Sequence, residues 1–217
     1  MWKYEKRLEY PVHIKHPNPA AAKIIISQLG GPDGETGAAE RYLNQRYSMP
    51  DRKVIGILTD IGTEELAHQE IVATIVTQLT KNLSYDEIKR SGFDTYFVDH
   101  TTGVYPQAAS GTPFSVASLQ VTGDVFTDLH EDIAAEQKAR LTYDNILRLV
   151  DDPDVIDPIR FLREREIVHY QRFCEAIAIT QQTCEDKCNF YAYNPAFDIT
   201  DHSLITAFIT DEGIQKR

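Results

Sequence analysis

This 217-residue chain lacks the marks of several protein classes. Its three cysteines, Cys174, Cys184 and Cys188, are too few and too clustered for a disulfide framework. It has no apolar run of about 20 residues, so we expect no membrane-spanning helix and no membrane partner. Positive charge is also short: 22 lysines and arginines face 33 acidic residues, and the net charge of −11 disfavours nucleic acid as a partner.

Common signal and cofactor motifs are missing as well. Residues 1–6 lack the apolar core of a secretory signal, so we expect synthesis in the cytoplasm, with a reducing environment as the default. A later move into an oxidising environment stays open. The sequence has no phosphate-binding glycine loop and no Cys-x-x-Cys-His motif, so P-loop nucleotide chemistry and c-type haem have no support.

The composition is that of an ordinary globular protein, with 42% hydrophobic and 25% charged residues. Its length suits one domain, or one domain with a tail, and can bury a core without disulfides. Apolar side chains recur at spacings near 3.6 residues, as they do from Val54 to Leu79. This spacing predicts long amphipathic helices.

Two helical hairpins follow from these patterns. The first covers residues 20–81, with a break at the glycines and proline of 30–34 and a turn at Pro50. The second covers residues 114–182, with a turn just before Pro153, because proline is tolerated at the first position of a helix.

The residues between the hairpins, 84–114, are rich in glycine and proline and predict a long irregular crossover, with a short helix near 85–90 as an option. Two hairpins joined by one long connection are typical of the ferritin-like four-helix bundle, so we predict an all-α fold. The predicted parts are an N-terminal arm at 1–18, the bundle at 19–183 and an irregular C-terminal tail at 184–217. The tail is expected to pack over the body or a neighbouring subunit, with a loose extension as the alternative.

A pattern of glutamate and histidine occurs once in each hairpin. The first copy is Glu35, Glu65 and His68, and the second is Glu136, Glu166 and His169. In both copies a Glu-x-x-His begins thirty residues after a single glutamate, and the copies are offset by 101 residues. At the same offset, Ala38 and Tyr42 match Ala139 and Tyr143.

The spacing has a geometric meaning. The predicted turns near residues 50 and 151 lie midway between the two glutamates of each copy. In an antiparallel hairpin, two residues about fifteen positions from the turn both lie about 22 Å from it, and so at the same height. Residues i and i+3 share a helix face, so each Glu-x-x-His projects both side chains inward. We therefore expect four carboxylates and two imidazoles to converge in one layer.

Four buried glutamates need positive charge nearby, and two divalent cations would supply it. An oxygen-rich site with imidazole suits manganese or iron, and this ligand set is the one found in ferritin-like di-iron and di-manganese proteins. The alternative interpretation is a pair of amphipathic helices with charged outer faces. The repetition of the pattern across both predicted turns favours the metal site, but the ligands alone do not choose manganese over iron.

Four stretches of the sequence resemble a known family: residues 30–35, 57–68, 132–140 and 161–169. There the chain resembles the manganese catalase family, and in particular its spore-coat (CotJC-type) branch. The resemblance spans about residues 4–200.

The resemblance implies five ligands for two manganese ions: Glu35, Glu65, His68, Glu136 and His169. Glu65 would bridge the ions, and Glu166 would be a proton acceptor rather than a ligand. This breaks the symmetric interpretation, in which Glu166 also bridges. Some family members carry an arginine just before the third-helix glutamate, but Ala135 stands there in this chain, which puts any gating by that group in doubt.

The implied activity is the disproportionation of hydrogen peroxide to water and oxygen, with the metal pair cycling between Mn(II)₂ and Mn(III)₂. The resemblance also implies a homohexamer and a place in the spore coat, with other coat proteins as partners. Two alternatives remain. One is a di-iron oxidase or ferroxidase-like protein on the same ligands, and the other is a structural coat protein with an incidental metal site.

Other histidines and cysteines are given no role in this chemistry. We expect surface or structural positions for five histidines: His13, His16, His100, His130 and His202. Cys184 and Cys188 could bind metal or cross-link a coat, or they could be incidental thiols.

Overall fold

Long helices dominate the computed structural model of the chain, which describes residues 7–187, 207–210 and 213–216. The chain divides into two units, residues 1–183 and 184–217, and each is described by itself. None of the described helices combines the length and apolar character that a membrane crossing requires. The assignment of an arm, a bundle and a tail as three functional parts stays a prediction.

The first hairpin consists of a broken helix followed by a long one. Its elements are α1 (Pro19–Ile25), α2 (Ser27–Gly30), α3 (Glu35–Gln45), the 3₁₀ turn η1 (Arg46–Ser48) and α4 (Arg52–Leu79). Side chains cap the helix starts: Asn18 accepts a hydrogen bond from the Ala21 N–H, and Asp51 accepts one from the Lys53 N–H. These elements match the predicted first hairpin, including its break.

The break before α3 lets the crossover pass close to the first hairpin. A Cβ atom on Gly30 would lie 2.1 Å from the backbone nitrogen of Gln107, so no other residue fits there without a shift of the backbone. The chain then resumes its helix at Glu35, the first residue of α3.

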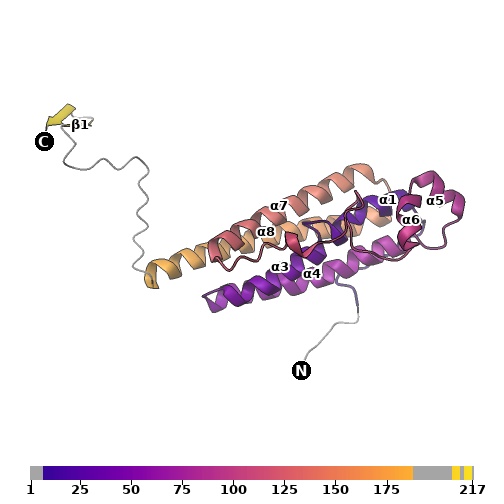
Figure 1. The fold of residues 1–217 in the computed structure, drawn as a ribbon, viewed down its shortest axis with the longest axis horizontal. Coiled ribbons are helices and arrows are strands. Elements are labelled where there is room, and N and C mark those ends of the chain that lie inside the picture. The colour runs from indigo at the N-terminus through magenta and orange to yellow at the C-terminus, as the bar shows by residue number, and fades with distance from the viewer. Residues whose placement is uncertain (1–6, 188–206, 211–212, 217) are drawn as a thin grey trace, which may run out of the picture. The chain divides into compact units, whose positions relative to one another are not determined.

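The second hairpin consists of α7 (Val125–Leu149) and α8 (Pro153–Lys187). Figure 1 shows α7 alongside α8 and α3 alongside α4, with α5 and α6 at one end of the bundle. The prediction that the third helix begins at residue 114 is wrong by eleven residues, because α7 begins at Val125.

Buried polar side chains explain this late start. The Asp128 carboxylate accepts hydrogen bonds from the backbone N–H groups of Thr122 and Gly123, at 3.0 and 3.1 Å. The guanidinium of Arg41 on α3 donates to the carbonyls of Ser118 and Leu119, both at 3.0 Å. These bonds fix residues 118–123 outside a long helix and satisfy side chains that are themselves buried.

The crossover is more helical than predicted. It holds α5 (Tyr85–Ser91), α6 (Asp94–His100) and a 3₁₀ turn, η2 (Val116–Ser118). A capping box starts α5, with the Ser84 and Glu87 side chains each bonded to the other's backbone N–H. Gly92 ends α5 in the left-handed conformation, with φ of 71°.

The core of the first unit has two apolar clusters along the bundle. On α4, Val54, Leu58 and Ile61 belong to one cluster, while Ile71 and Ile75 belong to the other. Both clusters also contain residues of the second hairpin. The segment of α4 between residues 61 and 71 carries Glu65 and His68, so a polar layer separates the two apolar halves.

In the second unit, β1 (Ala207–Thr210) and β2 (Gly213–Lys216) pair antiparallel, with Ala207 opposite Lys216. A hairpin therefore forms in the segment that we predict to be irregular. Cys188 and His202, as well as the side chain of Cys184, lie outside the described residues.

Candidate metal centre

The structure brings all six residues of the repeated pattern together inside the bundle. Each is at most 3% exposed, and they come from four helices: Glu35 from α3, Glu65 and His68 from α4, Glu136 from α7, Glu166 and His169 from α8. Their common height follows from the equal distances to the two turns.

Glu65 lies between the two imidazoles. Its Oε1 atom is 2.7 Å from Nδ1 of His169, and its Oε2 atom is 3.0 Å from Nδ1 of His68. One carboxylate thus offers one oxygen to each side of the centre, which is the arrangement that a bridging ligand needs.

Each imidazole faces a second carboxylate as well. Nδ1 of His68 is 3.7 Å from Glu35 Oε2, and Nδ1 of His169 is 3.5 Å from Glu136 Oε2. Three groups of described residues have ligand atoms within 4.8 Å of one another. On the Nδ1 side of the imidazoles, Glu35, Glu65, His68 and Glu166 form the first, and Glu65, Glu136 and His169 form the second; Glu64, His68 and His169 form the third. Glu65 belongs to the first and the second of these groups.

Glu166 belongs to the first group but is not paired as Glu65 is. Its Oε1 atom is buried and has no hydrogen-bond partner. Burial, and then the negative charges of Glu136 and Glu35, raise the pKa of Glu166 well above its usual range. In the protein without metal, these surroundings therefore favour the protonated form of Glu166.

The pKa values of other groups in the centre are also shifted when no metal is bound. Burial and the charge of Glu65 raise the pKa of Glu35 to about 8. Burial acts to lower the pKa of His68 and of His169, but the charge of Glu65 and the contacts with the surrounding carboxylates together outweigh it and raise both pKa values well above the usual range. Imidazolium protons therefore compensate the carboxylates when no cation is bound.

Unpartnered buried atoms test whether the centre fits two metal ions. Glu136 Oε2 and Glu166 Oε1 are buried without a hydrogen-bond partner, and Glu65 Oε1 and His169 Nδ1 are buried and form no hydrogen bond although they lie 2.7 Å apart. Buried polar atoms normally have partners, and these four are carboxylate oxygens and an imidazole nitrogen gathered in one layer. The donor set fits a pair of divalent manganese or iron ions.

Two buried tyrosines cross between the hairpins to hold the outer carboxylates. The Tyr42 hydroxyl on α3 donates to Glu136 on α7, and the Tyr143 hydroxyl on α7 donates to Glu35 on α3. Burial raises the pKa of both hydroxyls, so they remain protonated donors. Sequence reasoning matched these tyrosines as repeat partners but gave them no role.

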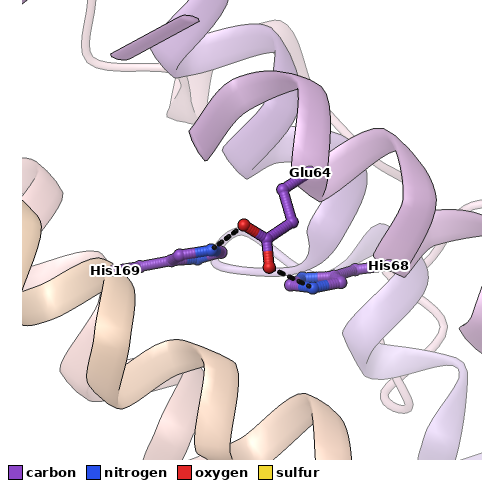
Figure 2. Close-up of side chains that lie close together, drawn as sticks. All are labelled: Glu64, His68 and His169. Atoms are coloured by element: carbon purple, nitrogen blue, oxygen red, sulfur yellow. Dashed lines mark ion pairs between the residues drawn. The ribbon is translucent and has the colours of Figure 1, made fainter. Parts of the chain in front are cut away.

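Sequence reasoning also missed Glu64 and Arg165, which touch the centre from outside. Figure 2 shows the Glu64 carboxylate between the outer edges of His68 and His169. Arg165 pairs with Glu64 through both carboxylate oxygens, at 2.5 and 3.1 Å. Burial acts to raise the pKa of Glu64, but contacts with the two histidines and Arg165 outweigh it and lower the pKa. The offset of 101 residues between Glu64 and Arg165 equals that of the repeat, and this was the sequence signal that could have pointed to them.

The N-terminal arm reaches the same region. Glu9 Oε2 lies 3.6 Å from Nε2 of His68, and the Tyr10 ring stacks on Phe161 with centroids 4.5 Å apart. The Tyr10 hydroxyl donates to Asp157 at 2.9 Å. The arm therefore covers one side of the candidate centre, which the sequence alone did not indicate.

Four histidines that we gave no metal role lie elsewhere. His13, His16 and His130 are exposed, and His100 stacks on Tyr105 with centroids 4.0 Å apart. None of them belongs to a described group that could hold a metal ion.

Comparison with known proteins gives a consistent result. The family model for manganese containing catalase matches residues 1–201. Protein CotJC of Bacillus subtilis is 51% identical over 187 residues, which cover 86% of this chain and 98% of that protein. A probable manganese catalase of Clostridium acetobutylicum is 35% identical and covers 98% of this chain and 92% of its own length.

A solved structure confirms the predicted all-α, ferritin-like fold class. KatB, a manganese catalase from Anabaena, superposes with a TM-score of 0.78 at 29% identity, covering 93% of this chain and 89% of KatB. Sequence and fold agree over nearly the whole chain, and the chain belongs to the manganese catalase family.

Proposed function

We propose that this protein is a dimanganese catalase that converts hydrogen peroxide to water and oxygen. The observation that carries the proposal is the position of Glu65, which belongs to two groups of potential ligands at once. In a chain of the manganese catalase family, such a shared carboxylate supports a bridged metal pair.

We assign the ligands as the resemblance to the manganese catalase family implies. Glu35, Glu65 and His68 would hold one manganese ion, and Glu65, Glu136 and His169 would hold the other. Bound there, the two ions would supply the two-electron redox capacity that each half of the reaction requires.

Glu166 is the proposed proton acceptor for incoming peroxide. It is buried, its Oε1 atom has no hydrogen-bond partner, and it stands beside the ligands of the first ion. Cations in the centre would lower its raised pKa, because positive charge favours the carboxylate form. A group with a pKa near the working pH can take up a proton in one step and return it in the next.

Other residues would orient the ligands and exclude bulk water. Tyr42 and Tyr143 hold Glu136 and Glu35 by donating hydrogen bonds to them. Because the six central side chains are at most 3% exposed, the bundle shields the centre from bulk water.

We also propose that the protein acts in the spore coat, since it resembles the CotJC-type branch and is 51% identical to Protein CotJC. Homohexamer formation and contacts with other coat proteins belong to this proposal. Synthesis in the cytoplasm stays a prediction.

One assay of the purified protein tests the proposed function against its alternatives. Manganese and iron are quantified, and oxygen release from hydrogen peroxide is followed. Two manganese ions per chain with oxygen release support the catalase. Bound iron with ferrous oxidation and no oxygen release would point to the di-iron oxidase, and bound metal with neither activity would favour a structural coat protein.

A further inference from the structure

One pair of positions departs from the repeat around the candidate centre. The ligands of the two copies match in type at an offset of 101 residues, but residue 64 is a glutamate and its counterpart, residue 165, is an arginine. The two side chains touch each other across the two hairpins. The two hairpins carry equivalent residues at an offset of 101. Two equivalent residues can touch only where the hairpins face each other, so Glu64 and Arg165 lie at the middle of this arrangement.

Glu64 faces both imidazoles from the side opposite the ligands. Its Oε1 atom is 3.5 Å from Nε2 of His68, and its Oε2 atom is 3.3 Å from Nε2 of His169. Figure 2 shows the carboxylate pointing one oxygen at each ring. Both Nε2 atoms are buried and have no hydrogen-bond partner, so Glu64 is well placed to accept an N–H from each.

Arg165 fixes the orientation of this carboxylate. Its Nε and Nη2 atoms lie 2.5 Å from Glu64 Oε1 and 3.1 Å from Glu64 Oε2. Such a two-pronged contact defines the plane of the carboxylate as well as its position. A glutamate at residue 165 would instead place two negative charges against each other.

We propose that Glu64 is a positioning residue that accepts the Nε2–H groups of both His68 and His169, and that Arg165 holds it in place. An N–H at Nε2 leaves Nδ1 of each ring free, and both Nδ1 atoms face Glu65. Carboxylates that accept the second N–H of a metal-bound histidine typically change metal affinity 10–100-fold. This inference rests on the proposed two-metal centre.

The first test is the variant Glu64→Gln, which keeps the size of the side chain and removes its charge. We expect its affinity for manganese to fall about 10–100-fold, with a changed electron paramagnetic resonance spectrum of the Mn(II) pair. The matched control is Asp60→Asn, because Asp60 and Arg172 form an ion pair between the same two helices at 3.1 Å. The control should keep wild-type affinity and spectrum.

The second test exchanges the two charges. The single variants Glu64→Arg and Arg165→Glu should each bind manganese more weakly than wild type. The double variant should bind manganese at least tenfold more tightly than the weaker-binding single variant, because residue 165 is the repeat counterpart of residue 64. No recovery in a folded double variant would overturn the positioning role of this pair.

Manganese binding by the wild type and by Glu64→Gln separates the role of Glu64 from the proposed function. Wild-type protein that binds no manganese would overturn the proposed function. Wild-type protein that binds two ions, together with a Glu64→Gln variant of equal affinity and identical spectrum, would overturn only the positioning role of Glu64.

Discussion

The two halves of the bundle carry the same pattern but place its Glu-x-x-His glutamates in opposite environments. Burial acts to raise the pKa of Glu65, but the charges of His169 and His68 outweigh it and lower the pKa. Burial also raises the pKa of Glu166, and there the neighbouring Glu136 and Glu35 raise it further. Repeat position therefore determines where a carboxylate lies, whereas its neighbours determine whether it holds a proton.

The largest effect should come from Glu65→Ala, which would remove the carboxylate shared by both halves. We expect loss of both manganese ions and of oxygen release to background, because each group of ligands loses a member. Metal content and oxygen evolution measure this. Glu164→Ala, at an exposed position of α8, is the control and should behave as wild type. Retention of two ions by Glu65→Ala would contradict the bridging assignment.

The counterpart change in the other half, Glu166→Gln, should have a different outcome. We expect the variant to keep two manganese ions and to lose rate by about 10²–10⁴-fold, the usual range for a positioned proton acceptor. The comparison uses kcat for oxygen release at matched metal content, with Glu164→Gln as control. Wild-type activity in Glu166→Gln would sink the proton-acceptor role and return the two halves to equivalence.

Metal binding should also depend on pH, because protons and cations compete for the centre. The pKa of Glu35 is raised to about 8 without metal, so below that pH a metal ion must displace its proton. Manganese affinity should therefore rise from pH 6 to 8, by about tenfold per pH unit for each displaced proton. Titrations in weak buffer would detect the released protons, and a flat profile would contradict this account.

The smallest effects should come from Tyr42→Phe and Tyr143→Phe, which each remove one hydrogen bond to an outer carboxylate. Because the two bonds are related by the repeat, we expect similar losses of manganese affinity, about tenfold each. Equilibrium binding of both variants side by side measures this. A large effect in one variant with none in the other would show that the halves contribute unequally.

Local and periodic features of the sequence predict most of the fold. Apolar spacing and the prolines at 50 and 153 predict both hairpins, and equal distances to the turns predict the height of all six central residues. The start of α7 was missed because Asp128 binds the backbone just before its own helix and Arg41 binds a carbonyl 78 residues along the chain, and neither contact has a periodic signal. The capping box at Ser84 was a local signal for α5 that could have been used.

The contacts around the centre were harder to foresee. An offset of 101 residues shows that Glu64 and Arg165 are equivalent, but it does not show that they touch. The arm follows its path because the Gln78 side chain donates to the Val12 carbonyl at 2.9 Å and accepts from the Ile14 N–H at 2.7 Å. Such long-range pairings leave no periodic trace in the sequence.

The division of the core into two apolar clusters has a consequence for how the protein matures. Each cluster joins both hairpins without using the polar layer between them, and protons on His68 and His169 balance the carboxylates there. We therefore expect the metal-free chain to fold first and to take up its cations afterwards. On this view the supply of manganese, rather than the completion of folding, sets the moment at which the protein becomes active.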